Sequence, residues 1–392
     1  MVTVKDGSHV YQLLQLLAIA GEFPASSLRL LGSERSVKDL VHRLESAQDI
    51  RFPPNESVLR TKLFTVSGYR EMRTVRLSKG ALPLLEGLHP KASDYYLRAT
   101  RNHQLAGGVH HVGRNHRVGE AIALAMMAGL EFRPYALPKL DQGIIARKAF
   151  PKPSFYIARD IKGSEFDDMD KTMFTRIVGA VFYPGGCYAV YNTRNAVMKW
   201  SGTGEFKAKH FLSGLNRYNN SSNDVESALL LGNDPAVALQ TIFESDKTKN
   251  MRKSSRFDKT YQRVHFIPLN SDGTQILKLL TLPDWNERML DALFERECRS
   301  WNQGFMEYDA VVNGVYVFSH LDADLARLIH FREGLLLEKE GGLPWKTETE
   351  RQFEVIGYPW QAEFLKAYLG GAAKLMFRPI PMETLIQHMD IT

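Results

Sequence analysis

The chain has few cysteines and no long apolar run. Only Cys187 and Cys298 occur among its 392 residues, too few for a disulfide framework, and no Cys-x-x-Cys pair is present to hold a structural zinc ion. The longest apolar stretch near the start, residues 13–20, is interrupted by Gln15 and is too short to span a bilayer. Because no basic leader precedes it, we expect no signal peptide and a cytoplasmic, reducing location.

Nucleotide-binding loops and metal motifs are also missing from the sequence. There is no Gly-x-x-x-x-Gly-Lys-Ser/Thr loop, and the Gly-rich pieces do not follow the strand–Gly-x-Gly-x-x-Gly–helix order. Four histidines gather at positions 103, 110, 111 and 116, but they lack His-x-x-x-His spacing and have no acidic residue among them. This pattern favours histidines of a core or domain junction. We read Asp322-x-Asp324 as helix caps, and expect no cofactor and no metal.

Charge is distributed unevenly along the chain. Lys and Arg total 50 against 44 Asp and Glu, a formal net charge of +6. Residues 1–120 contain 17 basic and 11 acidic side chains, whereas the remaining 272 residues contain 33 of each sign. The whole surplus therefore lies in the first third of the chain, where we expect an anionic partner to bind.

The order of elements in this basic third predicts a winged helix-turn-helix domain over residues 1–90. Helical patterns are expected at residues 8–20, 25–31 and 34–47, and strands at 57–66 and 73–77 around a polar tip at 67–71. Gly32 separates the second helix from the third, and Ser33 is placed to cap the third. The hairpin would be the wing.

Basic and small polar side chains occupy the positions that would face DNA. A recognition helix in the major groove needs such residues, and a wing needs cations for the flanking phosphates. The predicted DNA contacts are Ser33, Arg35, Ser36, Lys38, His42 and Arg43 on the third helix, and Arg70, Arg73, Arg76 and Lys79 on the wing. Winged helices also serve as protein-binding modules with solvated basic residues, so an adaptor function remains an alternative.

The rest of the chain is predicted to be a helical connector over residues 91–150 and one or more mixed α/β domains over 151–392. A sub-boundary is expected near 246–262, because residues 246–259 carry eight charges. The fold class is therefore multidomain α/β, or α+β. This neutral part is expected to mediate homodimerisation or to contact other proteins, and no membrane partner is expected.

Glu205-Phe206-Lys207 is similar to the Glu-x-Lys element with which restriction-endonuclease folds hold Mg²⁺ and activate water. The preceding hairpin, residues 177–192, would have to supply a second carboxylate, but it contains none. Glu205 is also expected to begin a helix, where an acidic residue favours the positive end of the helix dipole. We therefore predict a protein without catalytic residues, and keep an Mg²⁺-dependent nuclease using Glu205 and Lys207 as the alternative.

With these elements the chain resembles the replication-relaxation family, winged-helix proteins of plasmids and integrative conjugative elements. The similarity lies in Gly32–Lys38, Arg76–Gly80 and Asn102–Leu105, and more loosely in Val190–Thr193, Met198–Trp200 and Gly204–Lys207. The resemblance implies a degenerate restriction-endonuclease-like domain after the winged helix. It also implies binding of double-stranded DNA in replication, relaxation, conjugation or transcription regulation of a mobile genetic element, with relaxase, replication or transcription proteins as partners.

Overall fold

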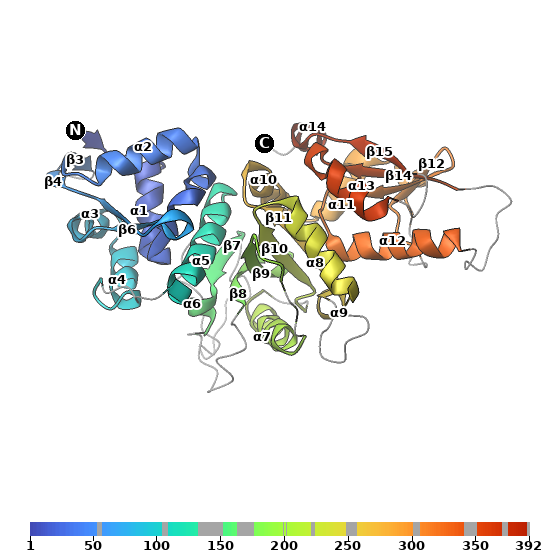
Figure 1. Ribbon diagram of the computed structural model, residues 1–392, viewed down its shortest axis with the longest axis horizontal. Coiled ribbons are helices and arrows are strands. Elements are labelled where there is room, and N and C mark those ends of the chain that lie inside the picture. The colour runs from blue at the N-terminus through green and yellow to red at the C-terminus, as the bar shows by residue number, and fades with distance from the viewer. Residues whose placement is uncertain are drawn as a thin grey trace.

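The computed structural model describes residues 1–52, 57–103, 109–131, 152–162, 176–198, 200, 202–220, 224–247, 257–300, 306–340, 351–370 and 375–389. An N-terminal region, a central five-stranded sheet and a C-terminal four-stranded sheet follow one another along the long axis (Figure 1). The chain is a mixed α/β protein, as the sequence predicts. Among the described residues, every helix is too short or too polar to span a bilayer.

The N-terminal region is built around one apolar helix. Its elements are α1 (His9–Ala20), β2 (Glu22–Pro24), the 3₁₀ helix η1 (Ala25–Leu31), α2 (Glu34–Leu44), β5 (Phe64–Ser67), the 3₁₀ turn η2 (Arg70–Met72) and β6 (Thr74–Leu77). Ser8 caps α1 by accepting a hydrogen bond from the Tyr11 amide at 3.4 Å. The three strands are antiparallel in the order β2-β6-β5, so the strand after α1 pairs with the last strand of the hairpin.

A second hairpin lies between α2 and β5, which corrects the single strand predicted over residues 57–66. β4 (Ser57–Thr61) pairs with β3 (Gln48–Phe52), and β3 pairs in parallel with β1 (Val2–Thr3). The chain leaves this sheet at Leu63, whose side chain is buried and whose amide donates to the Leu44 carbonyl at 2.9 Å. This backbone hydrogen bond lies where the chain passes from the β1-β3-β4 sheet to the β2-β6-β5 sheet. No local sequence pattern indicates it.

Helix α5 (Val109–Met127) joins the N-terminal region to the central sheet. It follows the 3₁₀ turn η3 (Lys79–Ala81), α3 (Leu82–Leu88) and α4 (Pro90–Ala99), and runs through Gly113, where the sequence predicted an interruption. Residues 121–125 are all buried, so the helix is covered on every side there. One side packs on α1 and β2 and another on β8 and β9. The boundary predicted between residues 150 and 151 lies outside the described residues.

The central sheet has the order β11-β10-β9-β8-β7. Its strands are β7 (Ser154–Ile157), β8 (Ile177–Tyr183), β9 (Gly186–Arg194), β10 (Ser227–Gly232) and β11 (Arg263–Pro268); the helices are α6 (Ala158–Lys162), α7 (Thr203–Asn220), α8 (Pro235–Lys247), α9 (Phe257–Thr260) and α10 (Ser271–Leu280). β7, β8 and β9 form an antiparallel meander, and β10 and β11 continue it in parallel. The predicted hairpin at 177–192 and the helix containing Glu205 are confirmed.

The C-terminal sheet, in the order β12-β13-β14-β15, again combines one hairpin with parallel strands. It comprises β12 (Ala310–Val312), β13 (Val315–Ser319), β14 (Gln352–Gly357) and β15 (Leu375–Pro379), with helices α12 (Leu325–Lys339), α13 (Ala362–Leu369) and α14 (Met382–His388) and the 3₁₀ helix η7 (Pro359–Gln361). α11 (Trp285–Leu293) and the 3₁₀ turn η6 (Arg296–Cys298) precede it, so the helix predicted over 285–298 ends early.

A buried glutamate ties the N-terminal region to the central sheet. The Glu120 carboxylate on α5 accepts hydrogen bonds from Ser27 Oγ of η1 at 2.6 Å and from Asn192 Nδ2 of β9 at 2.9 Å. Arg194 pairs with the same carboxylate at 3.1 Å. Because Ser27 belongs to η1 whereas Asn192 and Arg194 belong to β9, the fully buried Glu120 fixes α5 between these two elements.

Candidate nucleic-acid interface

Helix α2 presents basic side chains to solvent. Val37, Val41 and Leu44 form its buried stripe, as the spacing predicts. Arg35 and Lys38 lie on the opposite face and are exposed. His42 and Arg43, in the last turn, and Ser36 are exposed as well. Within the described residues, the Arg35 and Arg43 guanidinium groups have no carboxylate partner, so both are available to an anion.

The start of α2 differs from the expectation in one detail. Ser33 occupies the position before the helix, but its side chain makes no capping hydrogen bond. Lys38 instead pairs with Glu34 one turn earlier, and this contact lowers the pKa of the Glu34 carboxyl. Such exposed pairs contribute little to stability. Lys38 can therefore exchange Glu34 for a phosphate at small cost.

The tip of the β5–β6 hairpin carries an exposed aromatic ring and a cation. Tyr69 is 74% exposed, and the Arg70 guanidinium lies over its ring, 5.1 Å from the centroid. Gly68 has φ +86°, and a Cβ there would come within 2.4 Å of the Met72 carbonyl oxygen. Glycine is thus required for the turn that holds Tyr69 and Arg70 outward. Arg73 is exposed at the base of the tip.

Arg76 must be removed from the predicted DNA contacts, whereas Lys79 just beyond the hairpin is exposed. Arg76 Nε and Nη2 donate to Glu22 Oε2 at 2.8 and 2.6 Å, directly across the β2–β6 pair. Glu22 is fully buried and also accepts from Asn115 Nδ2 of α5 at 2.6 Å. A buried carboxylate needs a compensating cation, so Arg76 serves this ion pair instead of a phosphate.

A basic cavity lies where α5 meets the central sheet, and the sequence analysis missed it. The cavity has a volume of about 240 Å³ and is lined by Arg114 and Arg117 of α5, by Arg176 before β8, and by Asn192 and Thr193 of β9, among others. The described residues that line it include no Asp or Glu. The available signal was the spacing of Arg114 and Arg117, which lie one turn apart on a helix and therefore share a face.

Glu205 and Lys207 do not form a catalytic pair. Glu205 is 3% exposed, and its Oε1 accepts from Arg176 Nη1 at 3.0 Å. Lys207 is exposed, because residues two apart on a helix project from different sides. β8 and β9 supply no carboxylate either. The geometry required to hold Mg²⁺ between two acids is therefore not formed by these residues.

The histidines of the predicted cluster have separate partners. His103 contacts the Tyr96 hydroxyl at 2.6 Å through Nδ1, and His116 contacts Thr74 Oγ1 at 2.7 Å through Nε2. His116 is fully buried, which agrees with the predicted core role, and burial lowers its pKa to about 4. His111 is exposed, and the side chain of His110 is outside the described part of the chain.

Comparisons of the chain with protein-family models, with curated proteins and with solved structures return no match. The functional argument therefore depends on the surfaces just described. These are the exposed face of α2, the Tyr69–Arg70 tip and the arginine-lined cavity.

Proposed function

We propose that the chain binds double-stranded DNA through α2 and the β5–β6 hairpin, in the manner of a winged helix. The observation that carries the proposal is the exposed face of α2, on which Arg35 and Lys38 stand opposite the buried stripe. The element order α1, β2, η1, α2, β5, β6 and the strand order β2-β6-β5 support it. In this arrangement α2 enters the major groove and the hairpin follows the neighbouring backbone.

The hairpin is held beside α2 in a way that suits this role. The Val66 amide of β5 donates to Glu45 Oε1 at the end of α2, at 3.1 Å. This bond links the end of α2 to β5, and it thereby holds the Tyr69–Arg70 tip in position relative to the exposed face of α2. Arg70, Arg73 and Lys79 would neutralise phosphates beside the groove, a contribution independent of base sequence.

The central sheet favours phosphate binding over phosphodiester cleavage. A helix, three antiparallel strands, a helix and a parallel strand, here α5, β7–β9, α7 and β10, form the order expected of a restriction-endonuclease-like core. In place of paired acids, the cavity at β8 and β9 has Arg114 and Arg117, together with Arg176, which is paired with buried Glu205. Guanidinium groups bind phosphate oxygens and repel Mg²⁺. The nuclease alternative therefore has no support in this geometry.

The resemblance to replication-relaxation proteins suggests that the DNA belongs to a mobile genetic element. On that basis the protein would act in replication, relaxation or transcriptional control of the element. The C-terminal sheet, which lies at the far end of the molecule from α2, would then contact a relaxase, a replication protein or the transcription machinery (Figure 1).

The direct test is removal of two cations from the exposed face of α2. Arg35→Ala with Lys38→Ala should weaken binding to a fluorescent mixed-sequence duplex and reduce the slope of log affinity against log salt by about 2, since each phosphate contact contributes about 0.9. Binding is followed by anisotropy over a salt series. Retention of the wild-type affinity and slope would contradict the assignment of α2.

The matched control removes two cations elsewhere. Lys366→Ala with Arg296→Ala changes the net charge by the same amount at positions that are 65% and 81% exposed in the C-terminal half. This variant should bind DNA as the wild type does. A wild-type chain that binds no duplex at low salt would instead favour the protein-binding adaptor.

A further inference from the structure

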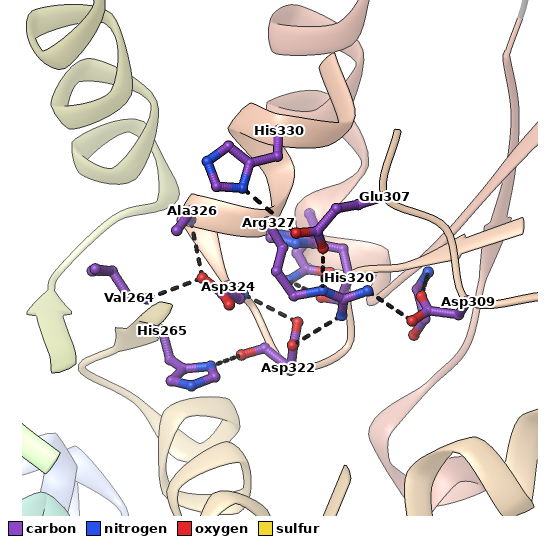
Figure 2. Close-up of polar contacts among 12 residues, drawn as sticks. Val264, His265, Glu307, Asp309, His320, Asp322, Asp324, Ala326, Arg327 and His330 are labelled. Carbon is purple, nitrogen blue, oxygen red and sulfur yellow. Dashed lines mark hydrogen bonds and ion pairs between the residues drawn. The ribbon is translucent and has the colours of Figure 1, made fainter. Parts of the chain in front are cut away.

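The central and C-terminal sheets meet at a buried polar cluster. The loop after β13 runs along β11, where the Phe266 amide donates to the Ala323 carbonyl at 2.9 Å and the Val264 amide to Asp324 Oδ1 at 2.9 Å. Figure 2 shows His265 of β11 facing this loop, with Asp322 and Asp324 beside it. All three side chains are fully buried. The cluster thus combines residues from two sheets that the DNA-binding proposal does not use.

The two aspartates have different partners. Asp324 caps α12, as the sequence predicted, through Oδ1, which accepts from the Ala326 amide at 2.9 Å as well as from Val264. Its second oxygen, Oδ2, is buried and has no hydrogen-bond partner. Asp322 Oδ1 accepts from the Asp324 amide at 3.1 Å, and its Oδ2 from Arg327 Nη1 at 3.2 Å. Capping of α12 accounts for the position of Asp324 Oδ1, whereas it assigns no role to Oδ2.

His265 is oriented as a ligand would be. Its Nδ1 lies 2.8 Å from the Asp322 carbonyl oxygen, and because a carbonyl can only accept, Nδ1 carries the hydrogen. The lone pair is then on Nε2, which is buried and has no partner. Histidines that bind metals usually donate their other ring nitrogen to a carbonyl or carboxylate in this way.

We propose that His265, Asp322 and Asp324 bind a divalent transition-metal ion, for which Zn²⁺ is the best match. Each of the three side chains offers one candidate ligand atom, and these atoms all lie within 4.8 Å of one another. His265 Nε2 and Asp324 Oδ2 are buried without a hydrogen-bond partner. One imidazole nitrogen and two carboxylate oxygens suit Zn²⁺ and its neighbours, whereas Mg²⁺ and Ca²⁺ prefer sites made of oxygen alone.

The charges around the cluster favour a cation of charge +2. Asp322 and Asp324 supply two fully buried carboxylates, and Asp309 supplies a third that is 10% exposed; Arg327 supplies one guanidinium, which pairs with Asp309 at 2.7 Å and with Asp322 at 3.2 Å. Fully ionised, this group has two uncompensated negative charges.

The ion would have a structural effect. His265 belongs to the central sheet, while Asp322 and Asp324 follow β13 of the C-terminal sheet, so one ion would join the two. None of the three side chains reaches the surface, so the fourth ligand position that three protein ligands leave on a tetrahedral ion would be buried as well. Binding to the folded state alone stabilises that state in proportion to the logarithm of ion concentration over Kd.

The experiment uses the full chain, stripped with a chelator and reloaded by dialysis against Zn²⁺, Co²⁺ or Mg²⁺. We expect about one tightly held Zn²⁺ per chain by elemental analysis, a higher midpoint of thermal unfolding with Zn²⁺ than with Mg²⁺, and visible d–d absorption for Co²⁺. A wild-type chain that retains no Zn²⁺ and unfolds at the same temperature with and without it overturns the proposal.

Matched variants separate metal binding from packing. Asp324→Asn and His265→Gln should each lose the bound ion, the shift in midpoint and the Co²⁺ spectrum. Asp309→Asn removes a carboxylate of the same network that is outside the ligand set, and should retain all three. Equal metal content in Asp324→Asn and wild type would overturn the assignment. Should the ligand variants fail to fold, the wild-type stoichiometry and Co²⁺ spectrum decide the question.

Discussion

Charged side chains occupy opposite environments at the two ends of the molecule. In the N-terminal region, which has the net positive charge, Arg35 and Arg70 are exposed. In the remaining 272 residues, where acids and bases balance, Asp322 is fully buried, Asp309 and Arg327 are only 10% and 12% exposed, and Arg327 binds both aspartates. Equal numbers of acidic and basic residues can therefore hide a network of ion pairs inside the protein. A surplus of basic residues indicates a binding surface only where these residues have no carboxylate partner.

One arginine of the N-terminal region does not follow this difference between the two ends of the molecule. Arg76 belongs to the basic N-terminal region, yet it is bound to buried Glu22, as Arg327 is bound to its aspartates. What separates Arg35 from Arg76 is the partner that each finds in the fold. Mutations of these arginines therefore test whether burial, rather than position along the chain, decides their role.

The largest effect is expected for Arg327→Met. The substitution keeps much of the side-chain volume but leaves Asp309 and Asp322 without their cation, so we expect a loss of about 3–5 kcal/mol in the free energy of unfolding. Urea titration followed by circular dichroism measures it. Arg296→Met, at an 81% exposed position, is the control and should change stability by less than about 0.5 kcal/mol. Equal effects would mean that the buried network contributes nothing.

A smaller loss is expected for Arg76→Gln. Glu22 loses its ion pair but keeps the hydrogen bond from Asn115, and Arg76 is 29% exposed, so water reaches the site. We expect a destabilisation of about 2–3 kcal/mol, against less than about 0.5 kcal/mol for Arg35→Gln. For DNA binding we expect the reverse order: per folded molecule, Arg35→Gln should lose more affinity than Arg76→Gln. A stable Arg76→Gln chain with weakened DNA binding would restore Arg76 to the interface.

The smallest effects concern pH, and their signs differ between the two ends. Burial lowers the pKa of His116 in the folded chain to about 4 from 6.5, so its contribution is complete above pH 6.5 and is lost as pH falls toward 4. Hydrogen bonds to Asp258 and Glu307 raise the pKa of His330 to about 9, so its contribution is complete below pH 6.5 and is lost as pH rises through 9.

Two glutamine variants test these opposite signs. His116→Gln should reduce the acid loss of stability without changing the alkaline side, and His330→Gln should do the reverse. Unfolding free energies measured across this pH range decide the matter. Curves that remain parallel to the wild type in both variants would show that other groups control the pH dependence.

Much of the local structure was predictable from the sequence. The hairpins around Pro184 and Asn313 and the cap at Asp324 depend on neighbouring residues, whose turn and capping preferences are local. The separate β3–β4 hairpin was not predictable in this way, because the break at Leu63 depends on a bond to Leu44. Helix α10 was missed although its start is marked locally, because Pro268 ends β11 and Asn270 caps the helix.

The candidate sites also differ in whether they depend on neighbouring residues or on contacts between distant parts of the chain. Exposure of Arg35 and Lys38 follows from helical periodicity, which any sequence displays. The pairing of Arg76 with Glu22 spans 54 residues, and that of His265 with Asp322 spans 57. Partners that lie so far apart in the sequence meet only when the sheets assemble. The sequence alone therefore did not show that Arg76 and Asp322 were already paired. Glu205 likewise met Arg176 only in the fold.

Helix α5 has a consequence for how the protein is made. Because residues 121–125 are buried on every side, the helix lies inside one continuous hydrophobic core that extends from α1 to the central sheet. A growing chain that ends before α5 leaves the apolar face of α1 uncovered, although α2 and the β5–β6 hairpin are already complete. The surface that we propose to bind DNA would therefore emerge early but acquire its rigid support only when the central sheet closes over the far side of α5.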